Sequence, residues 1–232
     1  MRRLRRLGGV ARHGVRGGLC NLALLLALAL PAAAEEVVIA ALGDSLTQGY
    51  GLPERDGFVP RMQAWLDARG HDVRLINAGV SGDTTAGGAA RAGWTLTPEV
   101  DGMIVALGGN DFLRGIDPAT SRANLDAILG AADEAGVETL VVGLVASPNY
   151  GPDWKAAFDA MYPDLARAHG DLLHPRWFGA LIEAAGGGSP QDLRPYMQPD
   201  GIHPNAEGVA LIVEDIGPSV ERLIDRIEAD GA

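Results

Sequence analysis

Five short apolar runs limit the folds open to this chain more than any other feature of its sequence. Short runs rich in Val, Ile and Leu are typical of strands buried on both faces of a parallel sheet. Segments with helical spacing of apolar residues separate them, which is typical of a single α/β domain with helices on both faces of the sheet. The five runs are residues 37–42, 73–77, 103–107, 139–144 and 172–173, and the helical segments are residues 57–70, 79–93, 118–136, 154–165 and 205–227.

Strands joined in this way by right-handed connections commonly form an open sheet of order 2-1-3-4-5. We therefore predict a three-layer, flavodoxin-like α/β fold with a five-stranded parallel sheet in that order. Three local features predict interruptions of the helices. Pro163 is expected to kink or shorten its helix, and Gly217-Pro218 to break the last helix. The glycine-rich residues 186–190 are expected to form a flexible loop.

Ser45 is a candidate nucleophile because it directly follows the first predicted strand. Ligands of open α/β sheets bind at the carboxyl ends of the strands, so a hydroxyl there faces a crevice. A serine or aspartate after a strand also commonly caps the next helix, and the position alone favours the cap. Near the other end of the chain, Asp200 lies three residues before His203. That spacing can place the carboxylate against one imidazole nitrogen and leave the other to take a proton from serine.

Four short blocks bring further residues of this kind together. They are Gly-Asp-Ser-Leu at 43–46, Asn-Ala-Gly-Val-Ser-Gly-Asp-Thr at 77–84, Gly-Gly-Asn-Asp at 108–111 and Asp-Gly-Ile-His at 200–203. With these blocks, in this order, the chain resembles the GDSL (SGNH) hydrolase family over residues 37–228. The resemblance implies that Ser45, Asp200 and His203 are catalytic. It also implies an oxyanion hole formed by the backbone N–H groups of Ser45 and Gly82 and the side-chain amide of Asn110.

Within that family the chain is most similar to the periplasmic group of multifunctional thioesterases, arylesterases and lysophospholipases. The similarity lies in residues 108–115, 149–151 and 200–205. It implies a secreted serine esterase or thioesterase that hydrolyses short to medium acyl esters, with a small-molecule or lipid acyl ester as substrate. It also implies that the substrate is contacted by Asp44, Phe112, Asn149 and Tyr150. Phe112 is bulkier than the small residue expected at its position, so the substrate preference is left open.

Other functions compete with this interpretation. A carbohydrate O-deacetylase would use the same residues, and a binding module would keep the fold without turnover. An α/β-hydrolase is disfavoured because the sequence Gly-x-Ser-x-Gly is absent: Ser45 is followed two positions later by Thr47, and Ser81 by Asp83. Nucleotide binding is disfavoured because the glycine-rich residues 79–88 lack the Gly-Lys-Ser/Thr ending of a phosphate loop.

The first 34 residues have the pattern of a secretory signal peptide. They contain six arginines and no acidic residue, then an apolar run at residues 22–30 and Pro-Ala-Ala-Ala at 31–34. A membrane anchor is the alternative, but the run is about half of the roughly 20 residues that a spanning helix needs. We therefore predict cleavage after Ala34, a hydrolase domain at residues 35–232, a periplasmic or secreted location and no membrane anchor after cleavage. The arginine pairs raise the twin-arginine route, but general secretion is favoured.

The predicted mature chain is strongly acidic. The sequence has 19 basic residues, six of them in the first 34, which leaves 13 against 30 acidic residues and a formal net charge of −17. Such a charge argues against nucleic acid or an anionic membrane as a partner. The single cysteine, Cys20, leaves with the predicted leader, so no disulfide is expected. His169 and His174 lack the spacing of a zinc site, and we expect a monomer with neither metal nor cofactor.

Overall fold

The computed structural model describes residues 36–230, so the predicted signal peptide lies outside the described residues. Five parallel strands form one sheet in the order β2-β1-β3-β4-β5, which confirms the predicted order. In the register, Leu42 of β1 lies opposite Ala78 of β2 on one side and Val105 of β3 on the other. The strands are β1 (Val37–Gly43), β2 (Val73–Gly79), β3 (Gly102–Ala106), β4 (Glu138–Val142) and β5 (Leu172–His174).

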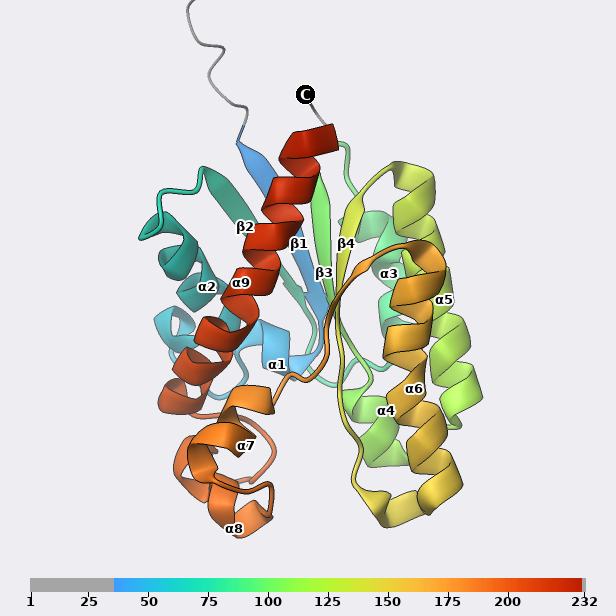
Figure 1. The fold of residues 1–232 in the computed structure, drawn as a ribbon, viewed down its shortest axis with the longest axis vertical. Coiled ribbons are helices and arrows are strands. Elements are labelled where there is room, and N and C mark those ends of the chain that lie inside the picture. Colours follow the sequence, from blue (N-terminus) through green and yellow to red (C-terminus); the bar gives the residue numbers. More distant parts are fainter. Residues whose placement is uncertain (1–35, 231–232) are drawn as a thin grey trace, which may run out of the picture. The chain divides into compact units, whose positions relative to one another are not determined.

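Helices cover both faces of the sheet (Figure 1). Side chains that alternate along β1 enter two separate cores, since Ile39 belongs to one cluster and Ala40 to the other. This alternation is the period of two that a strand imposes. One core is shared with α2 (Phe58–Asp67), α7 (Gly179–Ala185) and α9 (Ala206–Asp230), and the other with α3 (Thr85–Thr95), α5 (Pro118–Ala135) and α6 (Pro152–His169).

Neither proline ends its helix, so the predicted shortening at Pro163 and the predicted break at Gly217-Pro218 are wrong. The helix α6 continues through Pro163, and α9 continues through Pro218. A proline inside a helix costs about 3 kcal/mol, whereas each fully buried large apolar side chain contributes about 1.5–3 kcal/mol. Around Pro163 several such side chains are buried on one face of α6, namely Phe158, Met161, Tyr162 and Leu165. Next to Pro218, the missing side chain of Gly217 lets α9 approach the ring of Trp65 on α2, where a Cβ would come within 2.6 Å.

Several short helical turns follow the strands, and the sequence analysis predicted none of them because they are too short to show a period. One of them shortens the loop predicted at residues 186–190 by one residue, since residues 186–189 lie between α7 and α8. Pro190 begins α8, and Ser189 caps it, with its side chain and that of Asp192 forming a capping box. The turns are α1 (Ser45–Gln48), η1 (Glu54–Asp56), α4 (Gly109–Arg114), η2 (Pro148–Tyr150), α8 (Pro190–Leu193) and η3 (Arg194–Tyr196). Within residues 36–230, no helix has both the length and the apolar character needed to cross a membrane.

Candidate active site

Ser45 lies at the carboxyl end of β1, between β2 and β3 in the sheet, as the sequence predicts. Asp44 is the residue that caps the following helix, because its Oδ1 accepts a hydrogen bond from the Leu46 N–H at 3.0 Å. Ser45 is therefore the first residue of α1 and not its cap. Its hydroxyl is left to make another contact. The capping role weighed for Ser45 belongs to its neighbour.

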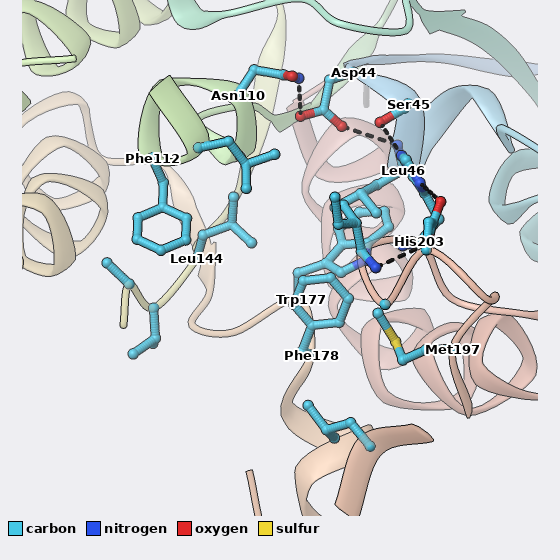
Figure 2. Close-up of a pocket in the computed structure, with 18 of the residues that line it drawn as sticks. Asp44, Ser45, Leu46, Asn110, Phe112, Leu144, Trp177, Phe178, Met197 and His203 are labelled. Carbon is cyan, nitrogen blue, oxygen red and sulfur yellow. Dashed lines mark hydrogen bonds and ion pairs between the residues drawn. The ribbon is translucent and has the colours of Figure 1, made fainter. Parts of the chain in front are cut away.

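The hydroxyl of Ser45 meets His203, and His203 meets Asp200. His203 Nε2 lies 2.8 Å from Ser45 Oγ, and His203 Nδ1 lies 2.7 Å from Asp200 Oδ2 (Figure 2). Because Asp200 takes the Nδ1–H, the Nε2 atom is left to accept the proton of the serine hydroxyl. The three predicted side chains thus form one hydrogen-bonded chain, although 158 residues separate the serine from the histidine.

Asp200 is held in its charged form. Desolvation acts to raise the pKa of this carboxyl, but hydrogen bonds from the His203 side chain and from the backbone N–H groups of Ile202 and His203 outweigh it and lower the pKa to about 2. A carboxylate that stays ionised in weak acid keeps the imidazole in one tautomer. This is the state in which Nε2 can act as a base.

The loops after β2 and β3 bring Gly82 and Asn110 to the same edge. Gly82 has a φ of +84°, a conformation that favours glycine. Among the hydrogen bonds within residues 36–230, the backbone N–H groups of Ser45 and Gly82 have no acceptor. Asn110 lies in the first turn of α4, where its Nδ2 donates to Asp83 O at 2.9 Å and to Asp44 Oδ2 at 3.3 Å. Two unused backbone donors and one amide with a long second bond therefore belong to residues that line the same cavity.

Asp44 borders the pocket, but the protein itself engages both of its carboxylate oxygens. One accepts the Leu46 N–H, and the other accepts the longer bond from Asn110. Burial, at 2 % exposure, raises the pKa of Asp44 to about 6, against the lowering effect of the hydrogen bond from Leu46. The structure therefore gives this predicted substrate contact a capping role and a contact with Asn110.

A cavity of about 650 Å³ opens beside Ser45 and His203. One wall comes from the loops after β3 and β4, with Phe112 and Leu144 (Figure 2). The other comes from the segment between β5 and α9, and its apolar side chains are Trp177, Phe178, Ile182, Leu193 and Met197. Mostly apolar walls with a few converging polar groups are typical of a site for a small, largely apolar ligand.

Of the predicted substrate contacts, Phe112 lines this cavity and two others do not. Asn149 and Tyr150 are not among the residues that line the cavity, and their contact with the substrate stays a prediction. The turn η2 carries Tyr150 behind Phe112, with the two ring centroids 6.1 Å apart in an edge-on arrangement. Tyr150 also packs on Trp154, with centroids 4.9 Å apart. The ring of Tyr150 therefore packs against other aromatic side chains.

Other residues at the site were missed by the sequence analysis. The ring of Tyr50 packs on the imidazole of His203, with centroids 4.7 Å apart, and Arg114 Nη2 donates to Gly82 O at 2.8 Å. Both lie within or beside the quoted sequence blocks, so proximity to a block is the signal that was available. The wall around Trp177 and Met197 carries no such signal, because its residues are ordinary apolar side chains that only the fold brings to the site. Within residues 36–230, no group of three or more His, Cys, Asp or Glu side chains is arranged to hold a metal ion.

A hydrogen-bonded serine, histidine and aspartate beside an apolar cavity, on the carboxyl edge of a 2-1-3-4-5 sheet, define a serine-type hydrolase of carboxylic esters. The model of the GDSL-like lipase/acylhydrolase family matches residues 41–211 of this sequence, and the chain belongs to that family. Its four motif blocks and its sheet order agree with that membership.

Named relatives are similar over most of their length. Esterase TesA of Pseudomonas aeruginosa PAO1 is 36% identical over 204 residues, which cover 88% of this chain and 96% of that protein. Thioesterase 1/protease 1/lysophospholipase L1 of Escherichia coli K12 is 32% identical over 203 residues, covering 87% and 91%. The crystal structure of the psychrotrophic esterase EstA from Pseudoalteromonas sp. superposes with a TM-score of 0.72 at 29% identity, covering 81% and 98%.

Proposed function

We propose that this protein hydrolyses short to medium acyl esters and thioesters through an acyl-enzyme formed on Ser45. The observation that carries the proposal is the continuous hydrogen-bonded chain from Asp200 through His203 to Ser45 at the mouth of the apolar cavity. The names of the relatives, which include esterase, thioesterase and lysophospholipase, support these substrate classes.

The proposed reaction begins when Ser45 Oγ attacks the ester carbonyl carbon and His203 Nε2 takes the hydroxyl proton. The carbonyl oxygen becomes an oxyanion, which the backbone N–H groups of Ser45 and Gly82 stabilise together with the Asn110 amide. The oxyanion takes over the Asn110 N–H that now makes the long bond to Asp44. His203 then gives its proton to the leaving alkoxide or thiolate, and a water molecule repeats the sequence to release the acid.

The apolar walls favour the acyl chain over a sugar as the group that fills the cavity. The test is a panel of p-nitrophenyl esters of increasing chain length, acyl thioesters, lysophospholipids and acetylated sugars, with Ser45→Ala as the blank. We expect turnover of the esters and thioesters. Turnover of the acetylated sugars alone would make the protein an O-deacetylase, and no turnover above the blank would make it a binding module.

The same proposal includes export and a soluble, monomeric mature form that does not bind nucleic acid. Its support is the arginine-rich leader with the small-residue motif before residue 35 and the acidic charge of the remaining chain. Protein recovered from a periplasmic extract should begin at or near Glu35 in amino-terminal sequencing. An intact leader that fractionates with membranes would contradict this.

A further inference from the structure

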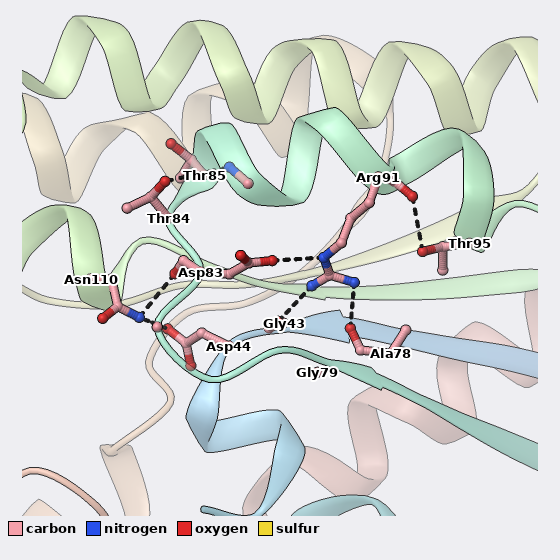
Figure 3. Close-up of polar contacts among 12 residues, drawn as sticks. Gly43, Asp44, Ala78, Gly79, Asp83, Thr84, Thr85, Arg91, Thr95 and Asn110 are labelled. Carbon is pink, nitrogen blue, oxygen red and sulfur yellow. Dashed lines mark hydrogen bonds and ion pairs between the residues drawn. The ribbon is translucent and has the colours of Figure 1, made fainter.

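Arg91 joins the loops that carry the candidate site, although it lies outside the cavity. It extends from α3 toward the ends of β1 and β2 (Figure 3). Its Nε donates to Asp83 Oδ2 at 2.7 Å, Nη1 donates to Ala78 O at 2.7 Å, and Nη2 donates to Gly43 O at 2.8 Å. A single guanidinium therefore holds three different segments at the carboxyl edge of the sheet.

Each acceptor lies next to a proposed oxyanion donor or to the loop that carries one. Gly43 immediately precedes Asp44 and Ser45 in the sequence, so its carbonyl fixes the start of the loop that carries the nucleophile. Asp83 immediately follows Gly82, and Ala78 lies one residue before the end of β2, where that loop begins. The guanidinium thus spans the base of both loops.

The third donor is reached through Asp83. While the carboxylate of Asp83 accepts from Arg91, its backbone carbonyl accepts the Asn110 amide at 2.9 Å (Figure 3). The side chains of Arg91 and Asp83 are 22% and 19% exposed, so their ion pair is better shielded than one on the open surface. A charge-assisted bond of this kind restricts Asp83, and Asp83 in turn restricts the amide.

We propose that Arg91 is the positioning residue of the oxyanion hole, holding its three donors in one arrangement. This rests on the proposed function, because the donors act only if an oxyanion forms. Arginine suits the task because its planar fork directs several N–H groups in fixed directions, whereas lysine offers one flexible ammonium. Donors held in place before the reaction need no reorganisation when the charge develops, and displacements of about 1 Å can cost roughly 100-fold in rate.

The competing explanation is that Arg91 merely ties the fold together, and Arg226 provides the matched control. Arg226 Nη1 donates to Glu138 Oε2 at 3.2 Å and to Gly170 O at 2.8 Å, so it also joins a carboxylate and a backbone carbonyl from separate segments. Its contacts lie at the amino end of β4 and before β5, on the opposite edge of the sheet. Its side chain is 35% exposed, so it is also partly buried.

The experiment compares Arg91→Met and Arg226→Met by kcat, KM and melting temperature with a p-nitrophenyl ester. For Arg91→Met we expect kcat to fall roughly 10- to 100-fold, with KM within about threefold, because the loss is confined to the transition state. For Arg226→Met we expect a lower melting temperature with kcat within about twofold. Unchanged kcat in folded Arg91→Met would overturn the proposal.

A double-mutant cycle with Asn110→Ala tests whether Arg91 acts through the oxyanion donors. If it does, Arg91→Met should cost clearly less in the Asn110→Ala background than in the native one, because the donor that it positions is already missing. Fully multiplicative losses would overturn the proposal. Should Arg91→Met fail to fold, Arg91→Lys keeps the charge without the fork, and full kcat in that variant would also overturn it. Failure of the proposed function itself looks different, since the native protein would then show no turnover above the Ser45→Ala blank.

Discussion

Residues 36–230 contain two sets of serine, histidine and aspartate in contact, and only one of these two has the surroundings of a catalyst. The second set consists of Ser219 and Asp215 on α9 and His174 at the end of β5. His174 Nδ1 lies 3.2 Å from Ser219 Oγ, and its Nε2 lies 3.2 Å from Arg176 O and 3.5 Å from Asp215 Oδ2. The residue types are the same as in the set of Ser45, Asp200 and His203, where the corresponding distances are shorter, at 2.8 Å and 2.7 Å.

The surroundings of the two serines differ in every other respect. Ser45 begins a helix at a strand end, beside unused backbone donors and a cavity. Ser219 lies inside α9 at 3% exposure, and its Oγ accepts a hydrogen bond from Arg222 Nη2 at 2.9 Å. The aspartates differ too, because Asp200 binds its histidine at 2.7 Å, whereas His174 Nε2 is closer to a backbone carbonyl. Access, oxyanion donors and a well-held base therefore distinguish the candidate catalyst from a buried polar contact.

The largest expected difference in kcat is between the variants of the two serines. Ser45→Ala should lower kcat on the order of 10⁴- to 10⁶-fold, because both the nucleophile and the acyl-enzyme are lost. Ser219→Ala should keep kcat within about twofold, since its hydroxyl reaches no substrate. A fluorophosphonate serine trap followed by peptide mapping checks the assignment: the peptide containing Ser45 should be labelled, in the native protein and in Ser219→Ala alike. Labelling at Ser219 or Ser81 would refute the assignment.

The second largest expected difference in kcat is between the variants of the two aspartates. Asp200→Asn should lower kcat about 10⁴-fold, because an amide no longer holds the imidazole in the tautomer that leaves Nε2 free to accept a proton. Asp215→Asn should leave kcat within about twofold. Asp192 lies in the capping box of α8 with Ser189 and is not expected to substitute for Asp200. Steady-state kinetics on the two variants decides, and near-native turnover in Asp200→Asn would remove that residue from the mechanism.

Removal of an oxyanion donor should lower kcat by a smaller factor. The set around Ser219 has no such donor, because Ser219 lies inside a helix. Asn110→Ala should lower kcat roughly 10²- to 10³-fold, equivalent to about 3–4 kcal/mol, with a much smaller change in KM. A merely structural asparagine would lower the melting temperature and leave kcat per folded molecule largely intact. Measuring both quantities on one preparation separates these outcomes. A kcat within about threefold of the native value would exclude Asn110 from the oxyanion hole.

The difference between the two sets also explains what could be predicted from the sequence. The sheet order follows from alternating strand and helix patterns, and it places Ser45, Gly82 and Asn110 on neighbouring loops. His174 and Ser219 could not be paired in this way, because a histidine at a strand end and a serine inside a helix are ordinary residues without a motif. Their contact depends on how α9 packs on β5, which is a property of the tertiary structure.

The details of the cavity escaped prediction for the same reason. The sequence does not reveal that Tyr150 packs against Phe112 and Trp154. These contacts depend on how the aromatic rings pack in the folded protein. Pro163 was expected to kink or shorten its helix and Gly217-Pro218 to break the last one, but both helices continue, because tertiary packing outweighs the local cost of each proline. Arg91 was missed because its three acceptors lie in segments that meet only in the folded sheet.

The smallest expected effect is on the free energy of unfolding. It comes from His174, which we expect to influence stability and not catalysis. Burial lowers the pKa of His174 below its usual value of about 6.5, although the nearby Asp215 acts to raise it. As the pH falls below about 6.5, His174 is protonated in the unfolded chain. In the folded protein it stays neutral until the pH reaches its lower pKa. The free energy of unfolding should fall with falling pH in that window, by up to about 1.4 kcal/mol per pH unit from this residue.

Other groups titrate in the same range, so the comparison with His174→Asn is the measurement that isolates this one. Burial raises the pKa of Asp44 to about 6 and that of Asp171 to about 7, and both shifts make stability rise as the pH falls. Those contributions remain in His174→Asn, whereas the opposing one from His174 is gone. Urea unfolding of both proteins from pH 7 to pH 5 should therefore show the native protein losing stability relative to the variant as the pH falls, whatever constant offset the substitution introduces. Parallel curves would show that His174 titrates alike in the folded and unfolded chains. The kcat profile across the same pH range should have the same shape in both proteins, because the imidazole that takes the serine proton is that of His203.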